Sequence, residues 1–122
     1  MPSYTKLPLS ASLYGRGISV NQTGISGNLI HSTPTSTGTI DEVWLYASNA
    51  ANNDTPLTIR FGSSGISGDV INNTVQAYGG AVLISPGFIL QGDGSNSSNI
   101  YATIPSGYSG YVNIFGYVNR IA

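Results

Sequence analysis

Clusters of turn-forming residues divide most of the chain into short apolar runs, with a spacing of about 8 to 12 residues between clusters. Ser, Thr, Asn and Gly together provide 54 of the 122 residues. In a helix these residues compete with the backbone hydrogen bonds or lose much conformational entropy, whereas the Val, Ile, Tyr and Thr residues between the clusters suit a pleated surface. The sequence therefore predicts an all-β fold with little helix.

Short strands are expected throughout the region from residue 28 to the end of the chain. A parallel sheet would need crossover helices that the sequence does not contain, so an antiparallel two-sheet β-sandwich of jelly-roll type is the most economical arrangement. Turns are expected at Gly62-Ser63-Ser64-Gly65 and Pro86-Gly87, among other positions, because Gly and Pro provide positive or fixed φ angles. The expected strands are 28–33, 39–48, 55–61, 70–78, 81–84, 88–90, 99–104 and 110–121.

The first 27 residues differ from the rest of the chain. Pro2, Pro8 and several Gly residues interrupt the apolar pattern there, and no acidic residue balances Lys6 and Arg16. We therefore expect residues 1–27 to form an N-terminal arm, and residues 28–122 to form a β-sandwich domain that folds without it. The alternative is an ordinary first strand over residues 13–20.

Two expected strands, 39–48 and 110–121, are apolar on both faces, although one face of an antiparallel sheet usually lies in water. One face of each strand carries aliphatic residues, and the other carries aromatic residues with a polar tip, which protein interfaces prefer. We expect that second face to be buried against other subunits. The alternatives are that the arm or a long loop of the same chain covers it, or that it is a platform on which sugar rings stack. The residues expected at the interface are Lys6, Arg16, Trp44, Tyr46, Tyr101, Tyr111, Phe115 and Tyr117.

Gly116 stands in the middle of the last expected strand. A glycine inside a strand is typical of a bulge or of a close approach by another backbone segment. We expect one of these two features there.

Few side chains in the sequence can titrate or attack a substrate. His31 is the only histidine and lies in an expected strand, so a hydrogen-bonded structural histidine is expected rather than part of a catalytic relay. Asp41 and Glu42 are adjacent in a strand and point to opposite faces, which excludes the facing carboxylate pair of a glycosidase. Asp93 begins a Ser- and Asn-rich segment, but Ile104 stands where a calcium loop would need Glu, so a tight turn is expected. We expect no catalytic residue, no metal and no cofactor.

Charge and cysteine content exclude further classes of partner. The chain has four basic and five acidic residues, a net charge of −1, and no cluster of Lys or Arg, so nucleic acid is not an expected partner. The absence of cysteine excludes disulfides, thiolate metal sites and a cysteine nucleophile. There is no apolar leader and no apolar run of about 20 residues, so we expect a soluble chain made in a cytoplasm, without a membrane partner.

Five short segments stand out within residues 30–62 and 86–121. They are Ile30-His31-Ser32-Thr33-Pro34, residues 41–49, residues 57–62, Pro86-Gly87 and residues 116–121. Together they resemble small virion proteins of tailed phages, including cyanophages, that are encoded among the head genes. The resemblance implies a jelly-roll-like cement or decoration protein, in many cases trimeric, bound to the outside of the major capsid lattice.

The expected function is therefore that of a non-enzymatic virion structural protein on the capsid surface, made in the host cytoplasm. Its expected partners are other copies of itself, as a homotrimer, and the major capsid protein. Two alternatives remain open: a tail-tip, receptor-binding module that recognises carbohydrate, and a tail or neck connector component. An adhesin would expose its aromatic residues beside polar side chains in a cleft between loops, whereas a cement protein would bury them against neighbours.

Overall fold

The computed structural model describes residues 3–21, 23, 27–62, 69–108 and 111–122. These residues contain nine β-strands and no helix. The strands are β1 (Tyr4–Pro8), β2 (Ile18–Val20), β3 (Asn28–Ser32), β4 (Ile40–Asn49), β5 (Thr55–Gly62), β6 (Val70–Val75), β7 (Val82–Gln91), β8 (Asn99–Thr103) and β9 (Val112–Ile121).

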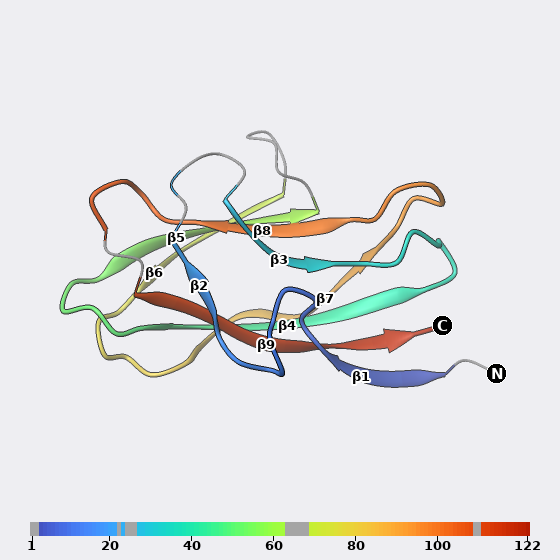
Figure 1. Ribbon diagram of the computed structural model, residues 1–122, viewed down its shortest axis with the longest axis horizontal. Coiled ribbons are helices and arrows are strands. Elements are labelled where there is room, and N and C mark those ends of the chain that lie inside the picture. The colour runs from blue at the N-terminus through green and yellow to red at the C-terminus, as the bar shows by residue number, and fades with distance from the viewer. Residues whose placement is uncertain (1–2, 22, 24–26, 63–68, 109–110) are drawn as a thin grey trace.

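All strand pairs are antiparallel, and the strands form two sheets. Sheet A has the order β1-β9-β4-β7, with β2 also paired to β9, and sheet B has the order β3-β8-β5-β6. Figure 1 shows the sheets as two layers, with both chain ends at the same end of the molecule. The fold is the all-β, two-sheet antiparallel sandwich that the sequence predicts.

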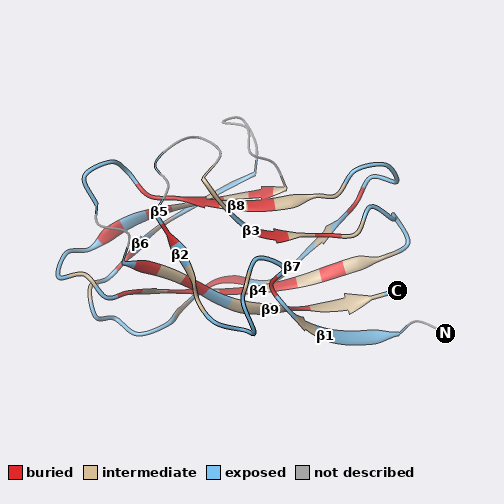
Figure 2. Ribbon diagram, in the orientation of Figure 1, coloured by how far each residue is buried: buried red, intermediate tan, exposed pale blue. Residues whose placement is uncertain are grey.

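Alternating burial along the strands explains why the two sheets pack face to face. In β4 every second residue from Asp41 to Asn49 is buried, and β5 repeats this pattern from Thr55 to Phe61. Buried residues occur in the strands of both layers, as Figure 2 shows, and the buried side chains of the two sheets form one hydrophobic core. Burying one such aliphatic side chain contributes about 1.5–3 kcal/mol, so the alternation provides the main driving force for the sandwich.

The N-terminal arm expected over residues 1–27 is not confirmed by the structure. β1 pairs with residues 117–121 of β9, and β2 pairs with residues 112–114 of the same strand. Leu9, between the two strands, and Val20, the last residue of β2, both enter the core, and both side chains are buried. The described part of this segment is therefore an interrupted edge strand of sheet A, closer to the alternative of an ordinary first strand.

The prediction of a turn at Pro86-Gly87 is wrong, because the two strands expected on either side of it form one continuous strand, β7. The pairing of β7 with β4 shifts register at two places around Trp44 and Leu45, and these irregularities accommodate the two residues. β7 lies at the edge of sheet A, where the missing N–H of Pro86 is tolerated. Gly87 has a φ of 82°, and a Cβ atom there would meet the Trp44 ring at 2.9 Å.

The close approach expected at Gly116 is confirmed. Gly116 pairs with Leu45 in the centre of sheet A, and a Cβ atom there would lie 2.0 Å from the carbonyl oxygen of Trp44. The turn expected at Gly62-Ser63-Ser64-Gly65 falls, apart from Gly62, outside the described residues.

Candidate functional site

The outer face of sheet A carries most of the aromatic residues expected at an interface. Trp44 and Tyr46 of β4 lie opposite Tyr117 and Phe115 of β9 in the antiparallel register. All four side chains are half-buried or exposed, because the alternate residues of both strands occupy the core. We call this surface the aromatic face; by register it also includes Ile40, Leu83, Ile89 and Ile121.

Contacts within the aromatic face hold its side chains in place. The rings of Trp44 and Tyr117 stack with their centroids 6.3 Å apart, and the Nζ atom of Lys6 lies 4.5 Å from the centroid of the Tyr117 ring. Glu42 Oε1 accepts hydrogen bonds from Trp44 Nε1 at 2.8 Å and from Asn119 Nδ2 at 2.9 Å, and these bonds lower the pKa of Glu42. A surface ordered in this way loses less side-chain entropy when it binds a partner.

Three other residues expected at the interface are not part of the aromatic face, although Arg16 borders it at Phe115. Tyr101 is on β8 of sheet B, where its hydroxyl accepts a hydrogen bond from Asn99 Nδ2 at 3.4 Å. Tyr111 precedes β9 at one end of the sandwich. Arg16 is exposed in the loop before β2 and lines a shallow hollow of about 510 Å³ together with Phe115. The aromatic face thus includes Lys6 but neither Tyr101 nor Tyr111.

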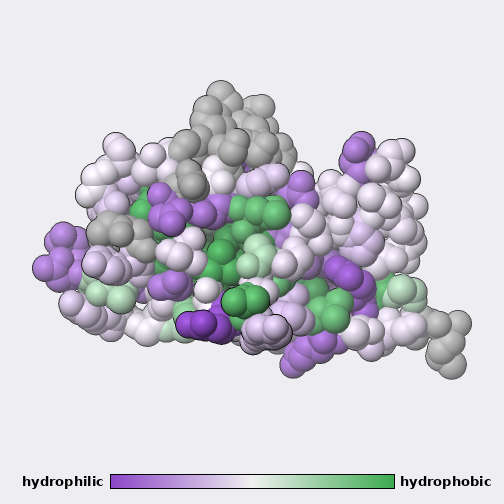
Figure 3. All heavy atoms as spheres, in the orientation of Figure 1, coloured by the Kyte–Doolittle hydropathy of each residue, from purple (hydrophilic) through white to green (hydrophobic). Residues whose placement is uncertain are grey.

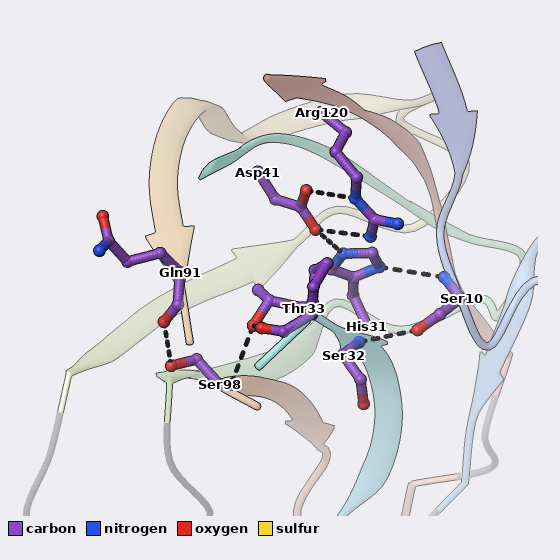
Figure 4. Close-up of polar contacts among 9 residues, drawn as sticks. Ser10, His31, Ser32, Thr33, Asp41, Gln91, Ser98 and Arg120 are labelled. Atoms are coloured by element: carbon purple, nitrogen blue, oxygen red, sulfur yellow. Dashed lines mark hydrogen bonds and ion pairs between the residues drawn. The ribbon is translucent and has the colours of Figure 1, made fainter. Parts of the chain in front are cut away.

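A buried charged cluster joins the two sheets (Figure 4). Asp41 on β4 is fully buried and accepts two hydrogen bonds from Arg120 on β9, from Nε to Oδ1 at 2.8 Å and from Nη2 to Oδ2 at 2.9 Å. On β3 of sheet B, His31 Nε2 lies 2.7 Å from Asp41 Oδ2, and the backbone N–H of Ser10 donates to His31 Nδ1 at 3.0 Å. The cluster therefore connects β3, β4, β9 and the loop after β1.

These contacts determine the protonation states in the cluster. Because a backbone N–H can only donate, His31 Nδ1 accepts, and the neutral ring carries its proton on Nε2 and donates it to Asp41. Burial lowers the pKa of His31, and the hydrogen bond to Asp41 opposes this only in part. Burial alone would raise the pKa of Asp41, but hydrogen bonds from Arg120 and His31 outweigh it and hold that pKa below its ordinary value. His31 is the structural strand histidine that the sequence predicts.

Asp93 forms the tight turn expected from the sequence. Its Oδ1 atom accepts the backbone N–H groups of Asn96 at 2.6 Å and Ser95 at 2.8 Å, and these bonds lower the pKa of Asp93. Across the described ranges, no three His, Asp or Glu side chains gather as a metal site would require. In the same ranges no helix is long and apolar enough to cross a membrane.

Comparison of the chain with protein-family models, with curated proteins and with solved structures found no match.

Two arrangements were not anticipated from the sequence. The first is the ion pair between Asp41 and Arg120, which are opposite one another in the register of β4 and β9. The second is a cleft that brings Tyr78, Tyr108 and Tyr111 together from two loops. A signal for the cleft was present, because each of these tyrosines stands next to a glycine in a turn-rich segment.

Proposed function

We propose that this protein is a non-enzymatic structural protein of a tailed-phage virion that binds the outside of the major capsid lattice as a cement or decoration protein. The observation that carries the proposal is the aromatic face, which presents ordered aromatic and aliphatic side chains on the outside of sheet A. Burying such a surface against another protein is favourable because it removes apolar area from water, and the net affinity depends on how well the ordered side chains fit their partner. The resemblance of residues 30–62 and 86–121 to small virion proteins of tailed phages favours a phage particle as the assembly.

The order of the strands supports a jelly-roll assignment for the sandwich. From β2 onward, every connection except that between β5 and β6 crosses from one sheet to the other. This gives the neighbours β2-β9-β4-β7 in one sheet and β3-β8-β5-β6 in the other, an arrangement of two interleaved Greek keys. Jelly rolls are common in viral capsid proteins.

A homotrimer that also contacts the major capsid protein would cover the aromatic face permanently. Only 7% of the residues are charged, which suits a protein that packs beside copies of itself. The structural use of the sole histidine supports a function without catalysis, because both ring nitrogens already have partners. We place the protein on the virion surface after synthesis in the host cytoplasm.

The test uses capsids assembled without this protein. Purified protein should cosediment with them and protect them against heat, because a ligand that binds only the intact lattice stabilises that lattice. The variant Phe115→Glu, which places a charge on the aromatic face, should lose both effects. Its matched control is Tyr101→Glu on the outer side of sheet B, which should retain them.

Electron cryomicroscopy of complete particles then locates the protein. Density on the capsid surface is expected, with the aromatic face in contact with neighbouring protein. Density at the neck or the tail, with none on the capsid, would contradict the proposal and support the connector alternative.

A further inference from the structure

One end of the sandwich carries a cleft lined by described residues of three loops: 50–55 from the end of β4 to the start of β5, Tyr78 between β6 and β7, and 106–108 with Tyr111 between β8 and β9. Figure 1 shows these loops at the end of the molecule opposite the two chain ends. The cleft has a volume of about 1180 Å³. Ligand pockets commonly enclose about 300–1,000 Å³, so the space suits an extended ligand of several rings rather than a single small molecule.

Three tyrosine rings line this cleft and reach the solvent. Tyr78 is 74% exposed, Tyr111 55% and Tyr108 39%. A tyrosine ring offers a flat apolar face together with a hydroxyl group that can donate or accept. Sugar rings have the complementary form, with an apolar C–H face and a rim of hydroxyl groups.

Polar side chains surround the tyrosines and determine which class of sugar fits. Asn52, Asp54 and Ser106 line the cleft with amide, carboxylate and hydroxyl groups, and Figure 3 shows hydrophilic atoms at this end of the molecule. Asp54 Oδ1 accepts the backbone N–H of Ala77 at 3.0 Å, which orients the carboxylate. Among the described lining residues there is no Lys or Arg, so an anionic sugar would meet only a negative charge. The lining therefore favours a neutral ligand.

Asn49 fixes two of the loops to each other. Its Nδ2 atom donates to the carbonyl oxygens of Asn53 at 2.9 Å and Val75 at 3.0 Å, and its own carbonyl oxygen accepts the N–H of Tyr78 at 2.9 Å. Because Asn49 is buried, these bonds are protected from water. These bonds hold the β4–β5 and β6–β7 sides of the cleft in place without a ligand.

Tyr78 has a backbone conformation that favours glycine. Its φ is +55°, in the left-handed region where a Cβ atom is unfavourable. The exposed ring receives little packing in return. Strained residues cluster at binding sites, so the position of Tyr78 in the cleft, together with its strained backbone, makes it a candidate contact residue for a ligand.

We propose that this tyrosine cleft binds a neutral oligosaccharide, with sugar rings stacked on the tyrosines and hydroxyl groups bonded to Asn52, Asp54 and Ser106. The inference is independent of the capsid proposal, because Tyr78, Tyr108 and Tyr111 do not belong to the aromatic face. A decoration protein with this cleft would present a sugar-binding surface on the particle.

To test this, isotopically labelled protein is titrated with sugars while its backbone amide signals are followed by NMR. The neutral ligands are hexasaccharides of glucose, mannose, galactose and N-acetylglucosamine, and the anionic ligand is hexagalacturonate. At least one neutral hexasaccharide should shift the amide signals of Asn52, Asp54, Tyr78 and Tyr111. Tyr78→Gly, which suits the positive φ, should stay folded and bind that sugar about tenfold or more weakly. Tyr111→Ala should weaken binding to a similar extent.

Tyr14→Gly is the matched control, because Tyr14 also has a positive φ, of 56°, and is 93% exposed but lies outside the cleft. It should bind the sugar like the unmodified protein. The proposal is overturned if no neutral hexasaccharide binds at millimolar concentration, or if the amide signals that shift belong to residues outside the cleft. It is also overturned if hexagalacturonate binds more tightly than every neutral hexasaccharide, or if Tyr14→Gly loses as much affinity as Tyr78→Gly. Tyr78→Gly should still bind capsids, so failure of this proposal is separable from failure of the capsid proposal.

Discussion

Asp41 lies fully buried between the two sheets and receives hydrogen bonds from both of them. Arg120 neutralises its charge, and His31 uses its single Nε2 proton to complete the contact. A buried ion pair adds little net stability over an apolar core, but leaving one member unpaired is strongly unfavourable. The contact between the two sheets at this cluster therefore depends on the protonation states of His31 and Asp41.

We predict that acid destabilises the fold through His31. The pKa of His31 is lowered in the folded state, so below about pH 6.5 the unfolded chain takes up a proton that the folded chain does not. The free energy of unfolding should fall as the pH drops below about 6.5, by up to about 1.4 kcal/mol per pH unit until the folded pKa is reached. The lowered pKa of Asp41 adds a further loss only below about pH 4. Urea unfolding at about pH 7, 6 and 5 measures the effect.

His31→Gln is the control for this prediction, since the chain contains no other histidine. The variant should show an almost constant free energy of unfolding between about pH 7 and pH 5. A slope equal to that of the unmodified protein would assign the pH dependence to other groups. The variant should also still decorate capsids, because His31 is inside the sandwich.

β9 organises sheet A, because it pairs with β1 and β2 on one side and with β4 on the other. Both of its faces are in use: the inner face contributes to the core, and the outer face carries part of the aromatic face. Close contact with β4 is possible only because Gly116 has no side chain at the point where it meets Trp44.

Gly116→Ala should destabilise the protein by about 3 kcal/mol or more, because the added Cβ lies 2.0 Å from a backbone oxygen in the centre of the sheet. Gly15→Ala is the matched control: its φ is also positive, at 83°, but nothing lies within 4 Å of the added Cβ. That variant should lose only about 1–2 kcal/mol, from the backbone conformation alone. Thermal and urea unfolding measure the stability of both variants. Equal losses of stability would show that the backbone around Trp44 moves to accommodate the added Cβ atom of Gly116→Ala.

The N-terminal strands are expected to be needed for folding. A chain that begins at Asn28 lacks β1, β2 and the buried side chains of Leu9 and Val20. Each of these side chains contributes about 1.5–3 kcal/mol, against a total stability of about 5–15 kcal/mol for a typical domain. Circular dichroism and NMR of the truncated chain should show an unfolded or aggregated protein. A well-dispersed NMR spectrum would instead support the independent arm expected from the sequence.

The molecule as a whole has two distinct surfaces with different chemistry. The aromatic face covers the outer side of sheet A, and the tyrosine cleft occupies the loop end of the sandwich. The first is suited to permanent contact with protein and the second to a solvated ligand. A protein with both would attach by one surface and remain available at the other.

We predict that the purified protein is a homotrimer held together through the aromatic face. Light scattering on a size-exclusion column should give about three times the chain mass of 12.7 kDa. Phe115→Glu should give a folded monomer, since the charge would lose its hydration in the interface, whereas Tyr101→Glu should remain trimeric. A monomeric unmodified protein at tens of micromolar would contradict the prediction.

Local pattern in the sequence was sufficient for the fold class and for the side of its own strand on which each core or outward residue lies. Strand alternation with a period of two depends only on neighbouring residues, so Trp44 and Tyr46 could be assigned to one side of their strand and Val43 and Leu45 to the other. A glycine inside an expected strand predicted either a bulge or a close approach at Gly116, and the position of the sole histidine in a strand predicted a structural role for His31.

The tertiary structure decided which distant segments meet. The pairing of Asp41 with Arg120, and of β1 and β2 with β9, joins residues that are far apart in the sequence, and no local pattern specifies such partners. Pro86 could lie inside a strand only because β7 is at the sheet edge, which is a property of the strand order. The tyrosine cleft likewise exists only because the sandwich brings separate loops to one end, where side chains from each can face a common space.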